Sequence, residues 1–337
     1  MRPVGHGNFL NITHYFTRTT MKQLLRVAAL LLLLPAIVLA GTVARKEQIS
    51  GAKLTVGLSN ARVAYTVEID SGRLSLDRLD GVPGWGNVSL RTDAGFSAEI
   101  MWTDWQAPKM LNNAENPVTL RKGDFRFDRH EFVEGENGSA ELLLYFHGND
   151  IPLLARVRCR LDSAAFYVHR TVAFSDTGAA GHFLQSVAPR DGAVAGDPTV
   201  MKSGGFGQPV AFTLGSGGGF FGVEYPAAEN TLQPSGGDMT VKCWHEVGRK
   251  IDRDWLESEW AVEGVSPTPY VKHWFMAYVD DIRVVPLRPY TLYNSWYDLR
   301  SAEYPRVPAG NIMEEKNVFH IIDLIRTNMI EKHKIQL

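Results

Sequence analysis

The chain has 337 residues, and its 35 lysines and arginines nearly balance its 37 aspartates and glutamates, which leaves a net charge of −2. This balance argues against a basic nucleic-acid-binding protein and against an acidic tail protein. Hydrophobic residues make up 45% and charged residues 21%, a mix that excludes an intrinsically disordered chain. The length permits two domains, and the presence of only two cysteines excludes a small disulfide-rich scaffold.

Residues 1–40 are predicted to be an N-terminal extension and a secretory signal peptide. A basic segment that begins at Met21 precedes an apolar run from Val27 to Leu39, and Ala40 suits cleavage by a signal peptidase. The alternative is an uncleaved membrane anchor over 27–44, because that stretch carries no formal charge. Whether translation starts at the first methionine or at Met21 is left open. The expected location is secreted or periplasmic, without membrane association after cleavage.

Residues 41–285 have the pattern of a β-domain. Apolar side chains recur at every second position from Val63 to Ile69, and Asp70-Ser71-Gly72 then predicts the turn of a hairpin. Similar runs separated by turn residues follow, and no stretch has the pattern of an amphipathic helix of three turns. An antiparallel region of this length favours a large two-sheet super-sandwich over an immunoglobulin-like domain. The predicted fold class is therefore mainly β.

Motifs for cofactors and metals are weak. The segment Gly217–Gly222 satisfies the spacing G-x-G-x-x-G, but no helix is predicted behind it. A nucleotide loop needs a helix N-terminus for the phosphates, so a glycine-rich hairpin is the better interpretation. His130-Glu131 and His245-Glu246 lack a second histidine at helical spacing. We therefore predict no cofactor, no metal site and no nucleic-acid partner.

Two further residue types leave alternatives open. Export would permit a disulfide between Cys159 and Cys243, and the alternative is two buried thiols in separate strands. Five of the eight tryptophans lie between residues 244 and 296. Aromatic rings beside carboxylates are typical of sugar sites, but they also fill the core of a sandwich and its domain interfaces.

Residues 286–337 change character and are predicted to hold a linker and the first unit of a βα-repeating domain. Residues 290–296 are predicted to form a short strand. Asn311 with Glu314 resembles a helix capping box, and the apolar positions from Val318 to Met329 form a helical stripe. The sequence ends where a second strand is predicted to begin, so we expect it to be a truncated piece of a longer protein.

One motif carries a resemblance to a known family. Tyr293-Asn294-Ser295-Trp296-Tyr297-Asp298-Leu299 resembles the first barrel strand of α-galactosidases (melibiases) and related clan D glycoside hydrolases. The order of parts is similar too: an exported galactose-mutarotase-like super-sandwich, a proline-bearing linker and the opening of a (β/α)8 barrel.

The resemblance implies roles for three residues. Trp296 matches the tryptophan that stacks on a pyranose ring, and the alternative is a buried aromatic at the barrel rim. Asn294 and Asp298 are candidates beside it, supporting the strand end. The catalytic aspartates of the family lie on later strands, beyond Leu337, so the chain alone is expected to have no turnover. The implied partner is a galactoside-type oligosaccharide or polysaccharide, and the linkage and anomeric outcome stay open.

Two other functions remain open. A stand-alone carbohydrate-binding or mutarotase-like sandwich would need a glutamate and a histidine that converge on one concave sheet. His169 and Glu224 are available, but the sequence does not place them together. The other function is a non-enzymatic envelope protein whose C-terminal helix docks a partner. An incomplete barrel would expose an unpaired strand edge, so self-association into a homo-oligomer is also expected.

Overall fold

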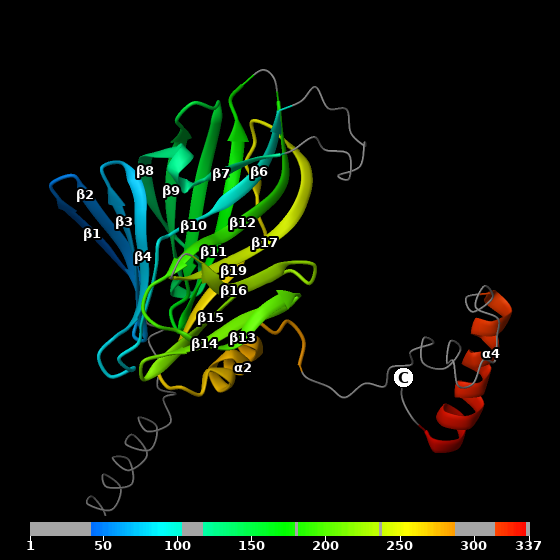
Figure 1. Cartoon of the computed structure of the whole chain (residues 1–337). Helices are drawn as coiled ribbons and strands as arrows, with labels where there is room; N and C mark the ends of the chain where they lie inside the picture. The colour runs from blue at the N-terminus through cyan, green and yellow to red at the C-terminus, as the bar shows by residue number, and fades with distance from the viewer. Residues whose placement is uncertain (1–41, 103–116, 179–180, 236–237, 287–313, 335–337) are drawn as a thin grey trace, which may run out of the picture. The chain divides into compact units, whose positions relative to one another are not determined.

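The computed structural model describes residues 42–102, 117–178, 181–235, 238–286 and 314–334. These ranges are mainly antiparallel β-structure, as Figure 1 shows, so the predicted fold class is confirmed. The chain divides into two compact units, the first ending at Val279 and the second beginning at Asp280. The signal peptide predicted over 1–40 and the strand predicted over 290–296 fall outside the described residues.

The strands of the first unit are β1 (Ala44–Ser50), β2 (Lys53–Ser59), β3 (Val63–Asp70), β4 (Arg73–Gly81), β5 (Ser89–Thr92), β6 (Ser97–Trp102), β7 (Val118–Arg121), β8 (Phe125–Glu134), β9 (Ala140–Gly148), β10 (Leu153–Leu161), β11 (Tyr167–Asp176), β12 (His182–Val194), β13 (Thr199–Phe206), β14 (Gln208–Leu214), β15 (Gly217–Val223), β16 (Glu229–Ser235), β17 (Asp238–Ile251), β18 (Leu256–Glu257) and β19 (Ala261–Ser266). One helix, α2 (Val271–Asp281), follows them.

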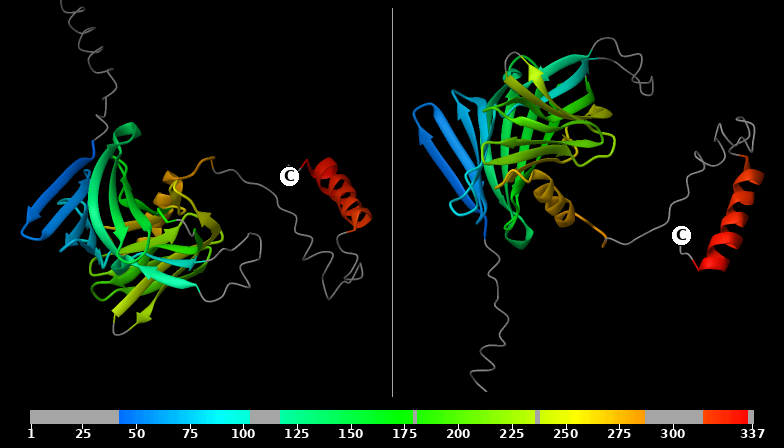
Figure 2. Two further views of the ribbon diagram at one scale, coloured as in Figure 1. Left: turned by 90° about the horizontal axis from the view of Figure 1, so that it is seen from above. Right: turned by 60° about the horizontal axis from the view of Figure 1, so that its bottom comes forward.

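Most strands form one antiparallel run in the order β8–β9–β10–β11–β19–β15–β14–β13–β16–β17–β12–β6–β7. Strands β1 to β5 form a meander that joins this run through the pairing of Thr92 with Val194. The short strand β18 pairs with β11. Figure 2 shows how strongly the strands curve, which lets so many of them enclose one core.

The hydrophobic core draws buried side chains from strands β2 to β12 and β14 to β19 and from helix α2. In β10 every second side chain is buried, which is the pattern of a strand with one face in the core. The predicted hairpin is confirmed, since β3 and β4 pair across a turn in which Ser71 and Gly72 have positive φ. Between the long run and the meander, the Cys159 thiol of β10 donates to the Tyr65 hydroxyl of β3 at 3.4 Å. Contacts of this kind fix the meander against the long run.

Helix α2 is a feature that the sequence analysis missed. Its 11 residues include Trp274, Phe275 and Tyr278, which favour strands, and they leave no clear polar face. The sheet has glycine where the helix approaches it: a Cβ on Gly218 of β15 would lie 2.5 Å from a methyl of Val271 and still closer to the backbone oxygen of Phe212, so both would have to shift. The segment Gly217–Gly222 is thus a buried strand that receives a helix, which agrees with the rejection of a nucleotide loop.

The second unit contains α4 (Glu315–Ile325), which continues as the π-helical segment η5 (Arg326–Glu331). The helix predicted from the apolar stripe is confirmed. The predicted capping box is wrong, because Glu314 has extended backbone dihedrals and occupies the N-cap, so it cannot be the third residue of the helix. Asn311 lies outside the described residues. No helix within the described ranges has both the length and the hydropathy needed to cross a bilayer.

The two cysteines are free thiols buried in different strands, Cys159 in β10 and Cys243 in β17. This is the alternative to the disulfide that the sequence permitted. Burial raises the pKa of the Cys243 thiol to about 12 and also raises the pKa of Cys159. Both side chains therefore stay protonated at neutral pH and act as small core residues.

Candidate functional site

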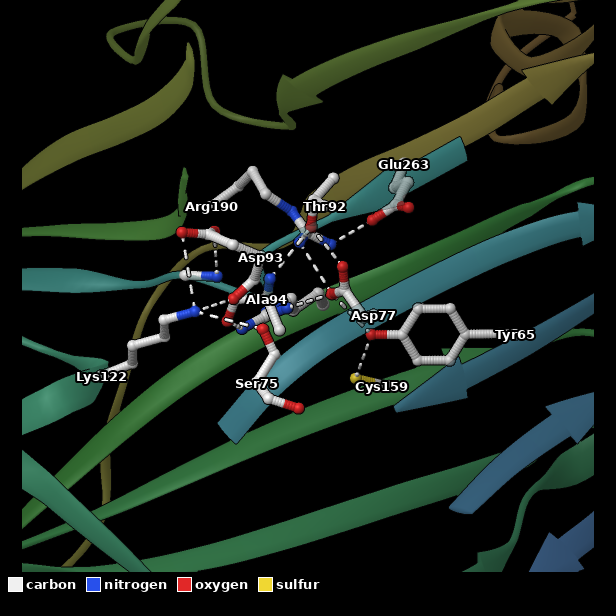
Figure 3. A network of polar contacts seen from close by, with 12 residues as sticks. Tyr65, Ser75, Asp77, Thr92, Asp93, Ala94, Lys122, Cys159, Arg190 and Glu263 are labelled. Atoms are coloured by element: carbon white, nitrogen blue, oxygen red, sulfur yellow. Dashed lines mark hydrogen bonds and ion pairs between the residues drawn. The ribbon is translucent and has the colours of Figure 1, made fainter. Parts of the chain in front are cut away.

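A buried polar cluster lies inside the β-structure (Figure 3), and its centre is Asp77 of β4. Arg170 of β11 and Arg190 of β12 each donate to Asp77 Oδ2 at 2.7 Å. The Thr92 hydroxyl donates to Oδ1, and the Tyr65 hydroxyl donates to Oδ2 at 3.2 Å. Both oxygens of Asp77 thus accept hydrogen bonds, and the side chain is 0% exposed.

Glu263 of β19 completes this cluster as a second carboxylate, bonded to Arg190 Nη2. Its other oxygen, Oε1, is buried without a hydrogen-bond partner. Burial raises the pKa of Glu263 to about 7, although the charge of Arg190 opposes that rise. For Asp77 burial acts in the same direction, but the two guanidinium groups outweigh it, so the pKa of Asp77 lies below its usual value. The cluster is sealed from solvent, and it ties β4, β11, β12 and β19 together.

A second polar cluster, which we call the His–Glu site, lies on the outer face of the long run and consists of His169, Glu224 and Tyr278. His169 Nε2 lies 2.8 Å from Glu224 Oε1, and the Tyr278 hydroxyl donates to the same oxygen at 2.5 Å. The side chains of His169 and Glu224 keep 14% and 25% of their surface exposed. This cluster therefore remains within reach of a solute, unlike the cluster around Asp77.

The strand register explains why these residues meet. His169 of β11 is paired with Val262 of β19, which is paired with Gly222 of β15. Glu224 lies two residues after Gly222, so it returns to the same face of the sheet as His169. Helix α2 brings in the third member, because Tyr278 packs edge-on against Tyr167 with ring centroids 4.9 Å apart.

Hydrogen bonding fixes the charge state of Glu224. Partial burial pushes its pKa up, but the hydrogen bonds from His169 and Tyr278 outweigh this, so the pKa lies below its usual value. Burial, followed by the Glu224 charge, raises the pKa of the Tyr278 hydroxyl. At neutral pH the site consequently offers a carboxylate acceptor, held in place by a hydroxyl that stays protonated and donates to it.

Charged and aromatic side chains continue outward from His169 over β10 and β9. The Trp260 ring lies 5.7 Å from the ring of His169, and the guanidinium of Arg158 stacks over the same indole at 4.8 Å. Arg158 also donates two hydrogen bonds to Glu141, at 2.9 and 2.6 Å, and lies 3.6 Å from Glu257. Two carboxylates thus anchor the guanidinium of Arg158, which stacks on the indole of Trp260 beside the His–Glu site.

The outcome for the residues predicted from sequence is mixed. Trp296, Asn294 and Asp298 lie outside the described residues. His169 and Glu224 are brought together, which the sequence alone did not establish. Tyr278 and Trp260 were missed as members of the site. Within the described ranges, no group of three or more histidine, cysteine, aspartate or glutamate side chains is placed to hold a metal ion.

No protein-family model and no curated protein matches the chain in sequence. Solved structures with a partly similar fold include α-galactosidases. AgaB, a GH36 enzyme from Geobacillus stearothermophilus, is 12% identical, with a TM-score of 0.44 over 67% of this chain and 41% of the enzyme. The galactosidase domain of the α-galactosidase–sucrose kinase AgaSK is 9% identical, with a TM-score of 0.45 over 67% of this chain and 42% of that one.

An α-galactosidase from Lactobacillus brevis is 8% identical to the chain, with a TM-score of 0.42 over 66% of this chain and 40% of that enzyme. The chain thus spans about two fifths of the length of these enzymes. At this level the likeness concerns the β-fold alone.

Proposed function

We propose that the chain is the β-sandwich part of an exported glycoside hydrolase of α-galactosidase type and that the His–Glu site binds a galactoside-type saccharide. The observation that carries the proposal is the convergence of His169, Glu224 and Tyr278 beside the indole of Trp260. The choice of a galactoside rests on the motif Tyr293–Leu299 and its resemblance to the first barrel strand of that family. Binding without turnover by this chain is part of the proposal.

The chemistry of the site suits a sugar. A pyranose presents hydroxyl groups that need both donors and acceptors, and a C–H face that packs on aromatic rings. Glu224 supplies a charged acceptor, His169 supplies a ring nitrogen, and Trp260 supplies an aromatic ring. The low pKa of Glu224 keeps the acceptor ionised, and hydrogen bonds to a charged group are about twice as strong as neutral ones.

Calorimetric titration of the full chain with methyl α-galactoside tests this proposal. We expect saturable binding, no hydrolysis of p-nitrophenyl α-galactoside, and about tenfold weaker binding in Glu224→Gln, the equivalent of one hydrogen bond. Glu131→Gln on β8 is the matched control, because Glu131 also accepts from a tyrosine hydroxyl, that of Tyr145, at 3.2 Å. Equal loss of binding in both variants, or no binding by the parent chain, would reject the proposal.

Sugar anomerisation is a second candidate, favoured specifically by the 2.8 Å separation of His169 and Glu224. Mutarotation needs one group to take the proton of the anomeric hydroxyl and another to protonate the ring oxygen. A glutamate whose pKa is lowered by two hydrogen bonds is a weak base, which makes binding the better supported function. Polarimetry on freshly dissolved α-galactose decides: a rate above that of buffer, lost in Glu224→Gln, would favour the anomerase.

A further inference from the structure

We infer that His245 is a positioning residue for the His–Glu site: its imidazole holds the backbone beside Trp260, and saccharide binding weakens when acid protonates it. The inference rests on the proposed function for its ligand, but its structural part does not. His245 lies on β17 and is 5% exposed, so it does not itself line the open face.

The hydrogen bonds of His245 allow only one protonation state. Its Nε2 lies 3.0 Å from the backbone nitrogen of Glu259, which is a donor, so Nε2 has to be the acceptor. Its Nδ1 lies 2.9 Å from the carbonyl oxygen of Glu246, so Nδ1 has to carry the proton. Both contacts are satisfied by the neutral imidazole. A second proton on Nε2 would point at the Glu259 N–H and break that hydrogen bond.

The segment that His245 holds is connected to both halves of the His–Glu site. Glu259 precedes Trp260, whose carbonyl accepts from the backbone N–H of Glu224 at 2.8 Å. The Trp260 ring lies against His169, the partner of Glu224. A shift of the Glu259–Trp260 peptide therefore moves the backbone that carries Glu224 and the ring that borders His169.

The other anchor of this segment is independent of pH. Ser258 is paired with Val172 of β11 in both directions: its N–H donates to the Val172 carbonyl at 2.9 Å, and its hydroxyl accepts from the Val172 N–H at 3.0 Å. Protonation of His245 is thus expected to displace Glu259 and Trp260 locally, without opening the sheet.

The surroundings of His245 favour the neutral form. The groups that face it are the Tyr225 ring at 5.7 Å, the backbone carbonyl of Glu246, the carboxylate of Glu259, and its strand neighbour Val187 on β12, which is uncharged. Burial lowers the pKa of His245 below 6.5, although the Glu246 carbonyl and the Glu259 charge oppose that shift. The neutral form that holds Glu259 is therefore complete at pH 7.5, and acid removes it at a lower pH than for an ordinary histidine.

The test is the pH profile of methyl α-galactoside binding between pH 5 and 8 in the full chain. In His245→Gln the side-chain amide oxygen can still accept from the Glu259 N–H, but the amide does not titrate. We expect the parent chain to lose about tenfold in affinity as His245 becomes protonated at the acid end of the profile, which is the contribution of one hydrogen bond. His245→Gln should keep the affinity of pH 7.5 across the range, and His245→Leu should bind about tenfold more weakly at every pH.

Two controls separate this inference from the proposed function. His147→Gln, at an exposed histidine on β9, should leave the acid limb unchanged. The ¹⁵N–¹H resonance of Glu259 in the sugar-free parent chain should shift with pH as His245 titrates, and it should not shift in His245→Gln. This measurement needs no ligand. An acid limb that persists in His245→Gln would assign the pH dependence to His169 and overturn the inference. A Glu259 amide that titrates while no sugar binds at any pH would reject the proposed function and support the positioning role.

Discussion

Two carboxylates of this molecule have similar partners but opposite surroundings. Asp77 and Glu224 each accept a hydrogen bond from a tyrosine hydroxyl and from at least one nitrogen of a basic side chain. Asp77 is 0% exposed, whereas a quarter of the Glu224 side chain remains exposed. The pKa of both carboxylates is lowered by their partners, against the opposing effect of burial.

The comparison shows that solvent access, more than the identity of the partners, separates a structural cluster from a candidate binding site. In the sealed cluster two arginines face two carboxylates, because an unpaired buried charge would be very costly. At the His–Glu site the same kind of bonding leaves one carboxylate oxygen of Glu224 for a ligand. The predictions below test this contrast through stability first and then through the site.

The largest effect is expected for Asp77→Ala. Removing this carboxylate leaves the guanidinium groups of Arg170 and Arg190 facing each other without their shared anion. Breaking a buried ion pair by removing one partner costs about 3–5 kcal/mol. Urea denaturation followed by far-UV circular dichroism should show this loss. Glu131→Ala on the exposed edge strand is the control, and a loss below about 1 kcal/mol for Asp77→Ala would mean that water reaches the cluster.

The next effect is a pH dependence of stability that comes from Glu263. Its pKa is about 7 in the folded chain against 4.5 in the unfolded chain, so the folded state holds the extra proton between these values. The free energy of unfolding should therefore fall as the pH rises from 4.5 to 7, by about 3 kcal/mol at most, at about 1.4 kcal/mol for each pH unit. Glu263→Gln should flatten this slope in urea titrations repeated at pH 4.5 and 7.5, whereas an unchanged slope would assign it elsewhere.

Local patterns in the sequence were enough for the β-domain but not for its sites. The alternation around Val63 and Ile69 predicted strand, turn and buried face, because each depends on near neighbours. His169 and Glu224 are 55 residues apart, and their meeting depends on β19 lying between β11 and β15, which no local pattern encodes. Helix α2 was missed because its aromatic residues favour strands, and Tyr278 was lost with it.

A smaller effect is expected for Tyr278→Phe, which removes one donor from Glu224 and keeps the ring packed on Tyr167. The loss of one net hydrogen bond should lower the free energy of unfolding by about 1 kcal/mol. Because that hydrogen bond helps to lower the pKa of Glu224, this pKa should move back toward 4.5, which ¹³C NMR titration of the carboxyl can follow. The matched control is Tyr145→Phe on β9, which should leave the titration of Glu224 unchanged.

The smallest effect on stability, and the sharpest test of the contrast, is expected for Glu224→Gln. The amide oxygen can still accept from Tyr278, and the lost charge was partly exposed to water, where a charge contributes little to folding. The free energy of unfolding should therefore change by less than about 1 kcal/mol, while Asp77→Asn, the same chemical change in the sealed cluster, should cost several times more. Similar losses for the two variants would mean that Glu224 is a structural residue. A small loss for Glu224→Gln would mean that folding does not depend on this carboxylate, as we expect for a residue that binds a ligand.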